Sequence, residues 1–536
     1  MKHSKTRGGA LALILAGAMV ATACTSGDDG DAAPDPDDGV ERIYVQALGG
    51  DPVTFGMNAQ FSSAPISQVM SAQMMDTLIM LSDDYELTPG LAESWELSDD
   101  GLQLTLTVRE GVTWHDGEPF TAEDVKFNFD EIVPLQVYGG PLAERIRSTE
   151  IVDDDEVLIT LSEPYGPILE AVAMQFMIPQ HVYEGSDYLT NPANNEPVGT
   201  GPFVFEAYSS GESVTLVRNP DYWGGDIEVD RLVYTTLPDA NTRAVSLFAG
   251  EIDQAAINPS EQERVLEDPD TELLEGGLFG QVVVAMFNAQ TPYLQDPAVR
   301  AAVFSALDRN EIVDTALSGL GEPANGFFPD SLGWAVNPDV DFNRDFPRDI
   351  KAIEKTLDDA GFPRGADGTR FTLRLNYITP LTEVGATVEL AQSMLAEVGI
   401  ATEVLGTSGA IFNEQTYTNS DFDVAFLRTS LGPDPSVGIT RWYVCNPNKL
   451  AASNPSGICD AEIDEAADAA LLTTDQKVRG DALKDLQGRA EELMFYGPLA
   501  WYYGANGTVN TSRWSGQDVR PPMTSRMPWL DMTPVD

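Results

Sequence analysis

The chain has 536 residues, more than one hydrophobic core usually organises, so we expect two or three packed units. Its 85 acidic and 31 basic residues give a formal net charge of −54, which argues against nucleic acid or an anionic membrane surface as a partner. The hydrophobic fraction of 43% is ordinary for a soluble globular protein, and no apolar run after the N-terminal segment is long enough to span a bilayer.

The N-terminal segment has the pattern of an export signal. Three basic residues precede an apolar stretch at 10–23, which is too short to cross a membrane but typical of a secretory signal peptide. Small residues lead into Cys24 and resemble the lipobox of bacterial lipoproteins, although Ala21 stands where a lipobox usually has Leu. We therefore expect residues 1–23 to be a lipoprotein signal peptide, Cys24 to carry lipid, and the Gly-, Pro- and Asp-rich residues 24–41 to be a disordered acidic tether.

From Ile43 onward, patterns typical of strands alternate with patterns typical of helices. The segment Gln103–Arg109 alternates polar and apolar β-formers and predicts a strand. A helix is predicted to start at Thr121, because Asp124 stands at the spacing of a capping box. Between them, Trp114–Gly117 contains the Asp and Gly that favour a turn.

Further along the chain, a buried strand is predicted just before a long helix. The run Gln281–Asn288 is apolar and rich in valine, as in strands covered on both faces. Asp296 and Pro297 then supply an N-cap and a first-turn residue for a helix over 298–314. One face of this helix is apolar and is expected to be buried: Val299, Val303, Ala306 and Leu307. Strands and helices mixed over such a length predict α/β lobes with mixed sheets.

The residues that most often carry chemistry are few. Cys445 and Cys459 lie in one loop, and in an exported protein this favours a disulfide over a metal site, since no histidine is close to either in sequence. His115 and His181 are isolated and are interpreted as turn or packing residues. The common catalytic and phosphate-binding motifs are absent from the sequence, which predicts a binding protein without a cofactor or a metal rather than an enzyme.

Four blocks of the sequence resemble one protein family. The run Gly90–Asp130 is similar to the signature stretch of the family 5 extracellular solute-binding proteins, the dipeptide, oligopeptide and nickel group. Three further blocks begin at Val198, Val282 and Phe422 and follow the order of the family. The resemblance implies an α/β fold of the periplasmic-binding-protein type (class II, cluster C), with two lobes of mixed sheet, a hinged cleft that closes on the ligand, and an extra inserted domain.

The resemblance also implies how the chain is divided. The expected segments are 42–75, 200–285 and 498–536 for lobe I, 76–199 for the inserted domain and 286–497 for lobe II. The chain is expected to cross between the lobes near Val282–Asn288 and Tyr496–Tyr503.

The position that usually anchors a peptide differs in this sequence. Peptide binders of the family place an acidic residue, which pairs with the peptide ammonium, three positions before an Asp-Pro pair. Counting back from Asp434 and Pro435 leads to Leu431, and Arg428 replaces the tryptophan that usually stands three positions earlier. Asp434 is a candidate substitute for the missing anchor. Arg428 is a candidate for binding a carboxylate or phosphate of the ligand, with an ordinary structural ion pair as the alternative.

Aromatic residues complete the set of candidate ligand-binding residues. Aromatic walls suit peptides, sugars and heterocycles alike, and the same residues are alternatively part of the core. The candidates are Tyr377, Trp442, Trp501 and Tyr502.

As a function, the resemblance implies the substrate-binding lipoprotein of an ABC importer. Such a protein captures a small solute, here most simply a peptide or peptide-like ligand, and delivers it to the permease and ATPase complex. The resemblance further implies a monomer held outside the cytoplasmic membrane by its lipid alone. The alternatives are the same transport role with a non-peptide acidic or sugar-like ligand, and a receptor that presents ligand to a membrane sensor.

Overall fold

The protein is described by a computed structural model that covers most of the chain beyond the N-terminal segment. It describes residues 41–50, 65–81, 86–136, 139–274, 281–379, 381–450, 452–503, 507–517 and 526–535. The predicted signal peptide (1–23), Cys24 and all but the last residue of the predicted tether (24–41) lie outside these residues. Residues 42–536 cluster as one unit by their contacts.

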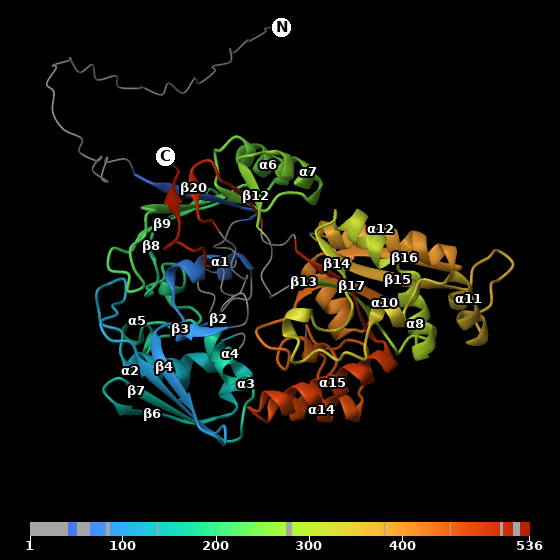
Figure 1. Ribbon diagram of the computed structural model, residues 1–536, viewed down its shortest axis with the longest axis horizontal. Coiled ribbons are helices and arrows are strands. Elements are labelled where there is room, and N and C mark those ends of the chain that lie inside the picture. Colours follow the sequence, from blue (N-terminus) through green and yellow to red (C-terminus); the bar gives the residue numbers. More distant parts are fainter. Residues whose placement is uncertain are drawn as a thin grey trace, which may run out of the picture. The chain divides into compact units, whose positions relative to one another are not determined.

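The first of three large sheets in the described residues is a mixed sheet of seven strands (Figure 1). Strand β1 runs parallel to both of its neighbours, β10 and β11, and the other pairs are antiparallel. In spatial order the strands are β12 (Thr271–Leu273), β19 (Thr508–Asn510), β11 (Gln254–Ala255), β1 (Ile43–Leu48), β10 (Arg231–Thr236), β9 (Ser213–Arg218) and β8 (Phe203–Ser209). The accompanying helices are α1 (Pro65–Met74), α6 (Ala240–Phe248) and α7 (Gln262–Glu267).

The second sheet is antiparallel and belongs to the segment inserted between α1 and β8. Its strands are, in spatial order, β4 (Ala92–Leu97), β5 (Gln103–Val108), β7 (Glu156–Leu161) and β6 (Ile146–Asp153). The same segment holds the hairpin β2 (Ile79–Leu81) and β3 (Leu87–Pro89), and the helices α2 (Ala122–Phe127), α3 (Gly140–Ala143), α4 (Ile168–Ala173) and α5 (Gln180–Tyr183). The predicted strand and capped helix are confirmed: the Asp124 carboxylate accepts a hydrogen bond from the Thr121 N–H at 3.0 Å.

The third sheet is mixed and has six strands. In spatial order these are β14 (Gly321–Pro323), β18 (Tyr496–Tyr502), β13 (Gln281–Phe287), β17 (Val424–Ser430), β15 (Phe371–Ile378) and β16 (Ile400–Thr407). The helices of this part are α8 (Pro297–Ala306), α9 (Arg309–Glu311), α10 (Phe342–Asp345), α11 (Ile350–Asp359), α12 (Thr382–Glu397), α13 (Gly409–Asn413), α14 (Ala461–Leu471) and α15 (Gln476–Leu493).

Short 3₁₀ and π turns, and one small hairpin, complete the described elements. The 3₁₀ turns are η4 (Val133–Leu135), η5 (Pro192–Asn194), η6 (Pro259–Glu261), η8 (Asp330–Leu332) and η10 (Ile439–Trp442). The π turns are η3 (Asn128–Ile132), η7 (Ile312–Ala316) and η9 (Glu414–Thr418). The hairpin pairs β20 (Trp514–Ser515) with β21 (Thr533–Pro534).

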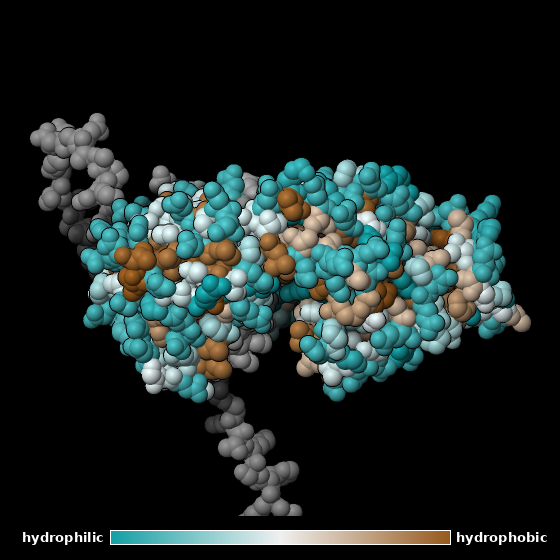
Figure 2. All heavy atoms as spheres, turned by 90° about the horizontal axis from the view of Figure 1, so that it is seen from below, coloured by the Kyte–Doolittle hydropathy of each residue, from teal (hydrophilic) through white to brown (hydrophobic). Residues whose placement is uncertain are grey.

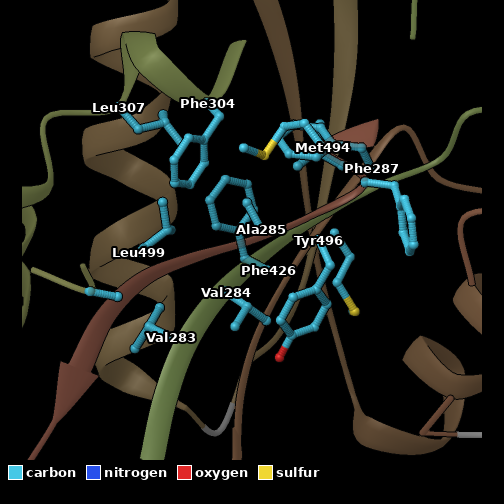
Figure 3. Close-up of a cluster of buried hydrophobic side chains, with 14 of the residues drawn as sticks. Val283, Val284, Ala285, Phe287, Phe304, Leu307, Phe426, Met494, Tyr496 and Leu499 are labelled. Carbon is cyan, nitrogen blue, oxygen red and sulfur yellow. The ribbon is translucent and has the colours of Figure 1, made fainter. Parts of the chain in front are cut away.

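The largest hydrophobic core lies on the six-stranded sheet. Strand β13 is buried along nearly its whole length, as its apolar sequence predicts. Figure 3 shows side chains of β13, β17 and β18 meeting Phe304 and Leu307, which come from α8 and its C-terminal end. Each large side chain removed from water in this way stabilises the fold by about 1.5–3 kcal/mol. By contrast, the face of the molecule in Figure 2 is mainly hydrophilic, with hydrophobic residues in small patches.

The helix predicted over 298–314 begins as expected but is interrupted. Asp296 caps it by accepting a hydrogen bond from the Ala298 N–H at 2.9 Å, and its predicted apolar face is buried. The helix ends at Ala306, because Asp308 starts a new helical turn by accepting a hydrogen bond from the Glu311 N–H at 3.2 Å. The local cap thus competes with continuation of the helix.

The sheets bear on the boundaries expected for the lobes. Residues 281–285 and 498–502 were assigned to lobe I, whereas β13 and β18 are central strands of the six-stranded sheet. Both strands lie in the same sheet as β15 and β17, which belong to the expected lobe II. Between described residues, the chain leaves the seven-stranded sheet after Leu274 and returns to it from Gly507. We propose that lobe II extends from about Gln281 to about Tyr503.

Candidate ligand cavity and its surroundings

A cavity of about 360 Å³ lies beside the C-terminal end of α1. The hairpin β2–β3 and the C-terminal residues 526–531 form other parts of its wall. Most of the wall is apolar: Met75, Met80, Leu81, Phe176, Pro202, Met527, Pro528, Trp529 and Leu530. The volume falls within the range of small-molecule sites in proteins.

One end of the cavity is polar and is organised around Asp76, which is 2% exposed. One carboxylate oxygen of Asp76 pairs with Arg526 at 2.5 Å. The other accepts hydrogen bonds from the Thr200 hydroxyl and the Trp223 indole N–H, both at 2.8 Å. Both oxygens of this buried carboxylate are therefore compensated, as a buried charge requires.

The Arg526 guanidinium is held by several further acceptors. Its Nε donates to the Ala72 carbonyl at 2.7 Å, and its Nη2 donates to the Met75 carbonyl at 2.6 Å, so that it closes the C-terminal end of α1. Its Nη1 also donates to the Tyr222 hydroxyl at 3.1 Å. Burial raises the pKa of Tyr222 to about 12, so the phenol is neutral and the charges at this end of the cavity cancel.

The predicted ligand residue Arg428 forms an ion pair in the structure. Its Nε lies 2.9 Å from the Glu383 carboxylate, and its guanidinium lies over the Tyr502 ring at 5.3 Å. Burial and then the Glu383 charge raise the pKa of Tyr502 to about 12. The structure thus brings together two of the six predicted ligand residues, Arg428 and Tyr502. Glu383 is the acidic partner required by the alternative that Arg428 forms an ordinary structural ion pair.

Asp434, the candidate substitute for the peptide anchor, is engaged within the protein. It is 3% exposed, its Oδ2 lies 2.6 Å from Arg479 Nη2, and its Oδ1 accepts from the Ser436 N–H at 2.7 Å. Arg479 also donates to the Gly166 carbonyl at 3.4 Å, and so links this part of the chain to the inserted segment. Burial and then the Asp434 charge raise the pKa of the nearby Glu170 carboxyl to about 7.

The remaining aromatic candidates lie mainly in the core. Trp442 is 1% exposed and stacks on Tyr496 with ring centroids 5.8 Å apart, and Trp501 is a buried residue of β18. Tyr377 is partly buried and packs against that core. None of the six predicted ligand residues is among the described residues that line the cavity. The reasoning from sequence missed Asp76 and Arg526, which no local motif marks.

Two other expectations concern cysteines and histidines. Cys445 and Cys459 are joined by a disulfide in the structure, with Cα atoms 4.5 Å apart. His115 is half-buried in the predicted turn, where its Nδ1 accepts from the Gly199 N–H at 3.2 Å and its Nε2 contacts the Gly201 carbonyl at 3.0 Å. Burial lowers the pKa of His115, so this side chain is a neutral packing group.

Two kinds of feature are absent from the described residues. Within that part of the chain, no group of three or more His, Cys, Asp or Glu side chains is placed to hold a metal ion. No helix there combines the length and the apolar character needed to cross a bilayer.

Comparisons with known proteins agree with the fold. The family described as bacterial extracellular solute-binding proteins, family 5 Middle, matches residues 86–449. Protein XP55 of Streptomyces lividans is 30% identical over 78% of this chain and 76% of its own length. The dipeptide-binding protein of Escherichia coli is 27% identical over 81% of this chain and 84% of its own. The crystal structure of the ABC transporter substrate-binding protein CtaP from Listeria monocytogenes has a TM-score of 0.82, with 24% identity, and covers 92% of this chain and 100% of that one.

Proposed function

This chain belongs to the bacterial extracellular solute-binding proteins of family 5, and we propose that its ligand is a peptide or a peptide-like solute. The chain is the substrate-binding protein of an ABC transporter and not an enzyme, and it works with a membrane permease. The observation that carries the peptide assignment is the similarity, over four fifths of the chain, to a protein that binds dipeptides.

The way in which this chain would hold a peptide differs from the family's usual acidic anchor. Leu431, at the anchor position, is 1% exposed, and Asp434 is already paired with Arg479. A peptide ammonium therefore has no free carboxylate at either position. Arg428 supports the alternative of an acidic, non-peptide ligand, provided that a ligand carboxylate displaces Glu383 from the guanidinium.

The experiment is to identify by mass spectrometry the small molecules that co-purify with the protein, and to test each in a thermal unfolding assay. A ligand at one hundred times its Kd stabilises the folded state by about 2.7 kcal/mol. Co-purified peptides that raise the unfolding temperature support the peptide assignment. Recovery of only acidic non-peptide solutes, with affinity lost in Arg428→Ala, contradicts it.

We also propose that Cys24 carries a lipid that anchors the protein, as a monomer, outside the cytoplasmic membrane. The proposal is supported by the apolar stretch at 10–23 and the small residues before Cys24. Cys24→Ala should release the protein from the membrane fraction, whereas Cys445→Ser should leave it there. Membrane retention of the Cys24→Ala protein contradicts the proposal.

A further inference from the structure

We propose that the cavity beside α1 binds an uncharged, apolar side chain of the transported peptide, of the size of leucine, methionine or phenylalanine. The inference rests on the proposed function for its peptide ligand, and it adds the class of side chain that this chain selects.

The walls of the cavity have the chemistry of an apolar site. Three methionine thioethers line it, from Met75, Met80 and Met527, together with the rings of Phe176 and Trp529. Methionine is flexible and polarisable, so such a wall adapts to apolar groups of different shape. The volume of about 360 Å³ is sufficient for one large side chain.

The charged groups at the polar end are already paired with each other. Asp76 uses both oxygens on protein donors, and Arg526 neutralises it at 2.5 Å. A ligand ammonium or carboxylate that entered beside the buried Met75 and Trp529 would lose its hydration without gaining a free partner of opposite charge there, because the remaining carboxylate of the lining, Asp531, is exposed. That loss is costly, so the cavity discriminates against charged side chains.

The indole donors near the cavity are also committed to the protein. Trp223 donates its N–H to Asp76 at 2.8 Å, and Trp529 donates its N–H to the Gln73 side-chain oxygen at 2.6 Å. What Trp529 presents to a ligand is therefore its hydrocarbon surface, which favours an apolar group.

The cavity has a deep part and an accessible edge. Met75, Phe176 and Trp529 are buried, whereas Thr88 is exposed and Leu530 is 51% exposed. Thr88 faces Met80 as its partner across the hairpin β2–β3. An apolar group can therefore enter between these edge residues without displacing the buried ones, and an exposed leucine at the entrance extends the apolar surface.

The experiment uses the purified full-length chain and two kinds of probe. The first is N-phenyl-1-naphthylamine, an uncharged dye whose fluorescence rises in apolar surroundings. The second is a set of competing tripeptides, Ala-Phe-Ala, Ala-Lys-Ala and Ala-Glu-Ala. We expect saturable binding of one dye molecule, and displacement by Ala-Phe-Ala at concentrations about 10- to 100-fold lower than by either charged peptide.

Two variants test whether the dye binds in this cavity. Thr88→Trp fills the entrance from an exposed strand position without removing a buried group, and Met80→Asp adds a charge to the wall. Val152→Trp is the matched control, because Val152 is 50% exposed in β6 and does not line the cavity. We expect Thr88→Trp and Met80→Asp to weaken dye binding about 10-fold or more and Val152→Trp to change it less than about twofold. Thermal unfolding establishes that each variant is folded, and Met80→Asp replaces Thr88→Trp if the latter is not.

Each outcome bears on one of the two proposals. Equal displacement by the three peptides, absence of saturable dye binding, or dye binding unaffected by both cavity variants overturns the assignment of the cavity. If the two substitutions at Thr88 and Met80 weaken dye binding but no peptide displaces the dye, the apolar site is supported and the peptide is overturned as its ligand.

Discussion

Replacing Arg479 by leucine should destabilise the protein strongly, because it leaves a buried carboxylate without its partner. Arg479 and Asp434 are 6% and 3% exposed in their side chains, and their closest atoms are 2.6 Å apart. Arg479 also donates to the Ser436 hydroxyl at 3.1 Å and to the Ala470 carbonyl at 3.2 Å. Removing one member of a buried ion pair costs about 3–5 kcal/mol, and we expect a loss in that range.

The measurement is equilibrium urea unfolding of the full-length chain, followed by circular dichroism. Lys477→Ala on the same helix is the matched control. Its ion pair with Asp481 joins side chains that are 82% and 56% exposed, so we expect a cost of about 0.5 kcal/mol or less.

A double-mutant cycle tests the cause of the loss. In a protein that already carries Asp434→Asn, Arg479→Leu leaves no unpaired buried carboxylate at position 434. The substitution should therefore lower the free energy of unfolding clearly less than it does in the wild-type protein. The reasoning is refuted if Arg479→Leu costs less than about 1 kcal/mol, or if the effects of the two substitutions add.

Three further changes test other features of the structure. Burial raises the pKa of the Glu170 carboxyl to about 7, so the stability that this group contributes in its neutral form is lost as the pH rises through 7. Glu170→Gln should therefore stabilise the protein by about 1–3 kcal/mol at pH 8 in urea unfolding, and by much less near pH 5. A stability difference that does not depend on pH contradicts this. Cys445→Ser removes the disulfide to Cys459, which has a sequence separation of 14, and should lower the free energy of unfolding by about 3 kcal/mol in the same assay. Wild-type protein that is as stable with reductant as without it would contradict this. Gly199→Ala would place a methyl group against the Met74 carbonyl and should lower the free energy of unfolding by about 1–3 kcal/mol. Gly140→Ala is the control and should be close to neutral, because the space around Gly140 is open. Equal effects of the two substitutions would show that the Gly199 backbone can shift.

The sequence predicted local elements well because their signals are local. The capped helix after Thr121 and the buried strand over 281–287 each follow from a few adjacent residues. The sequence did not indicate that the same apolar run joins the six-stranded sheet, because burial on both faces says nothing about which sheet a strand joins. The helix after Asp296 was predicted too long, because the competing cap at Asp308 was overlooked.

The cavity could not be predicted in this way. Asp76 and Arg526 are 450 residues apart in the sequence, and each is an ordinary charged residue in its own surroundings. Their pairing is a product of the tertiary structure, which no spacing rule captures. Conversely, Trp442 is an aromatic residue of the kind that lines binding sites, yet it fills the core, where its large apolar surface is more stabilising.

The placement of β13 and β18 has a mechanical consequence. Gln281 and Tyr502 face each other at the same end of this antiparallel pair, so both connections to the rest of the chain lead away from one end of the ladder. A tension applied through these connections would break the hydrogen bonds between the two strands one after another from this end, rather than all of them at once. We therefore expect the six-stranded domain to yield at a lower force than a domain whose terminal strands are pulled from opposite ends.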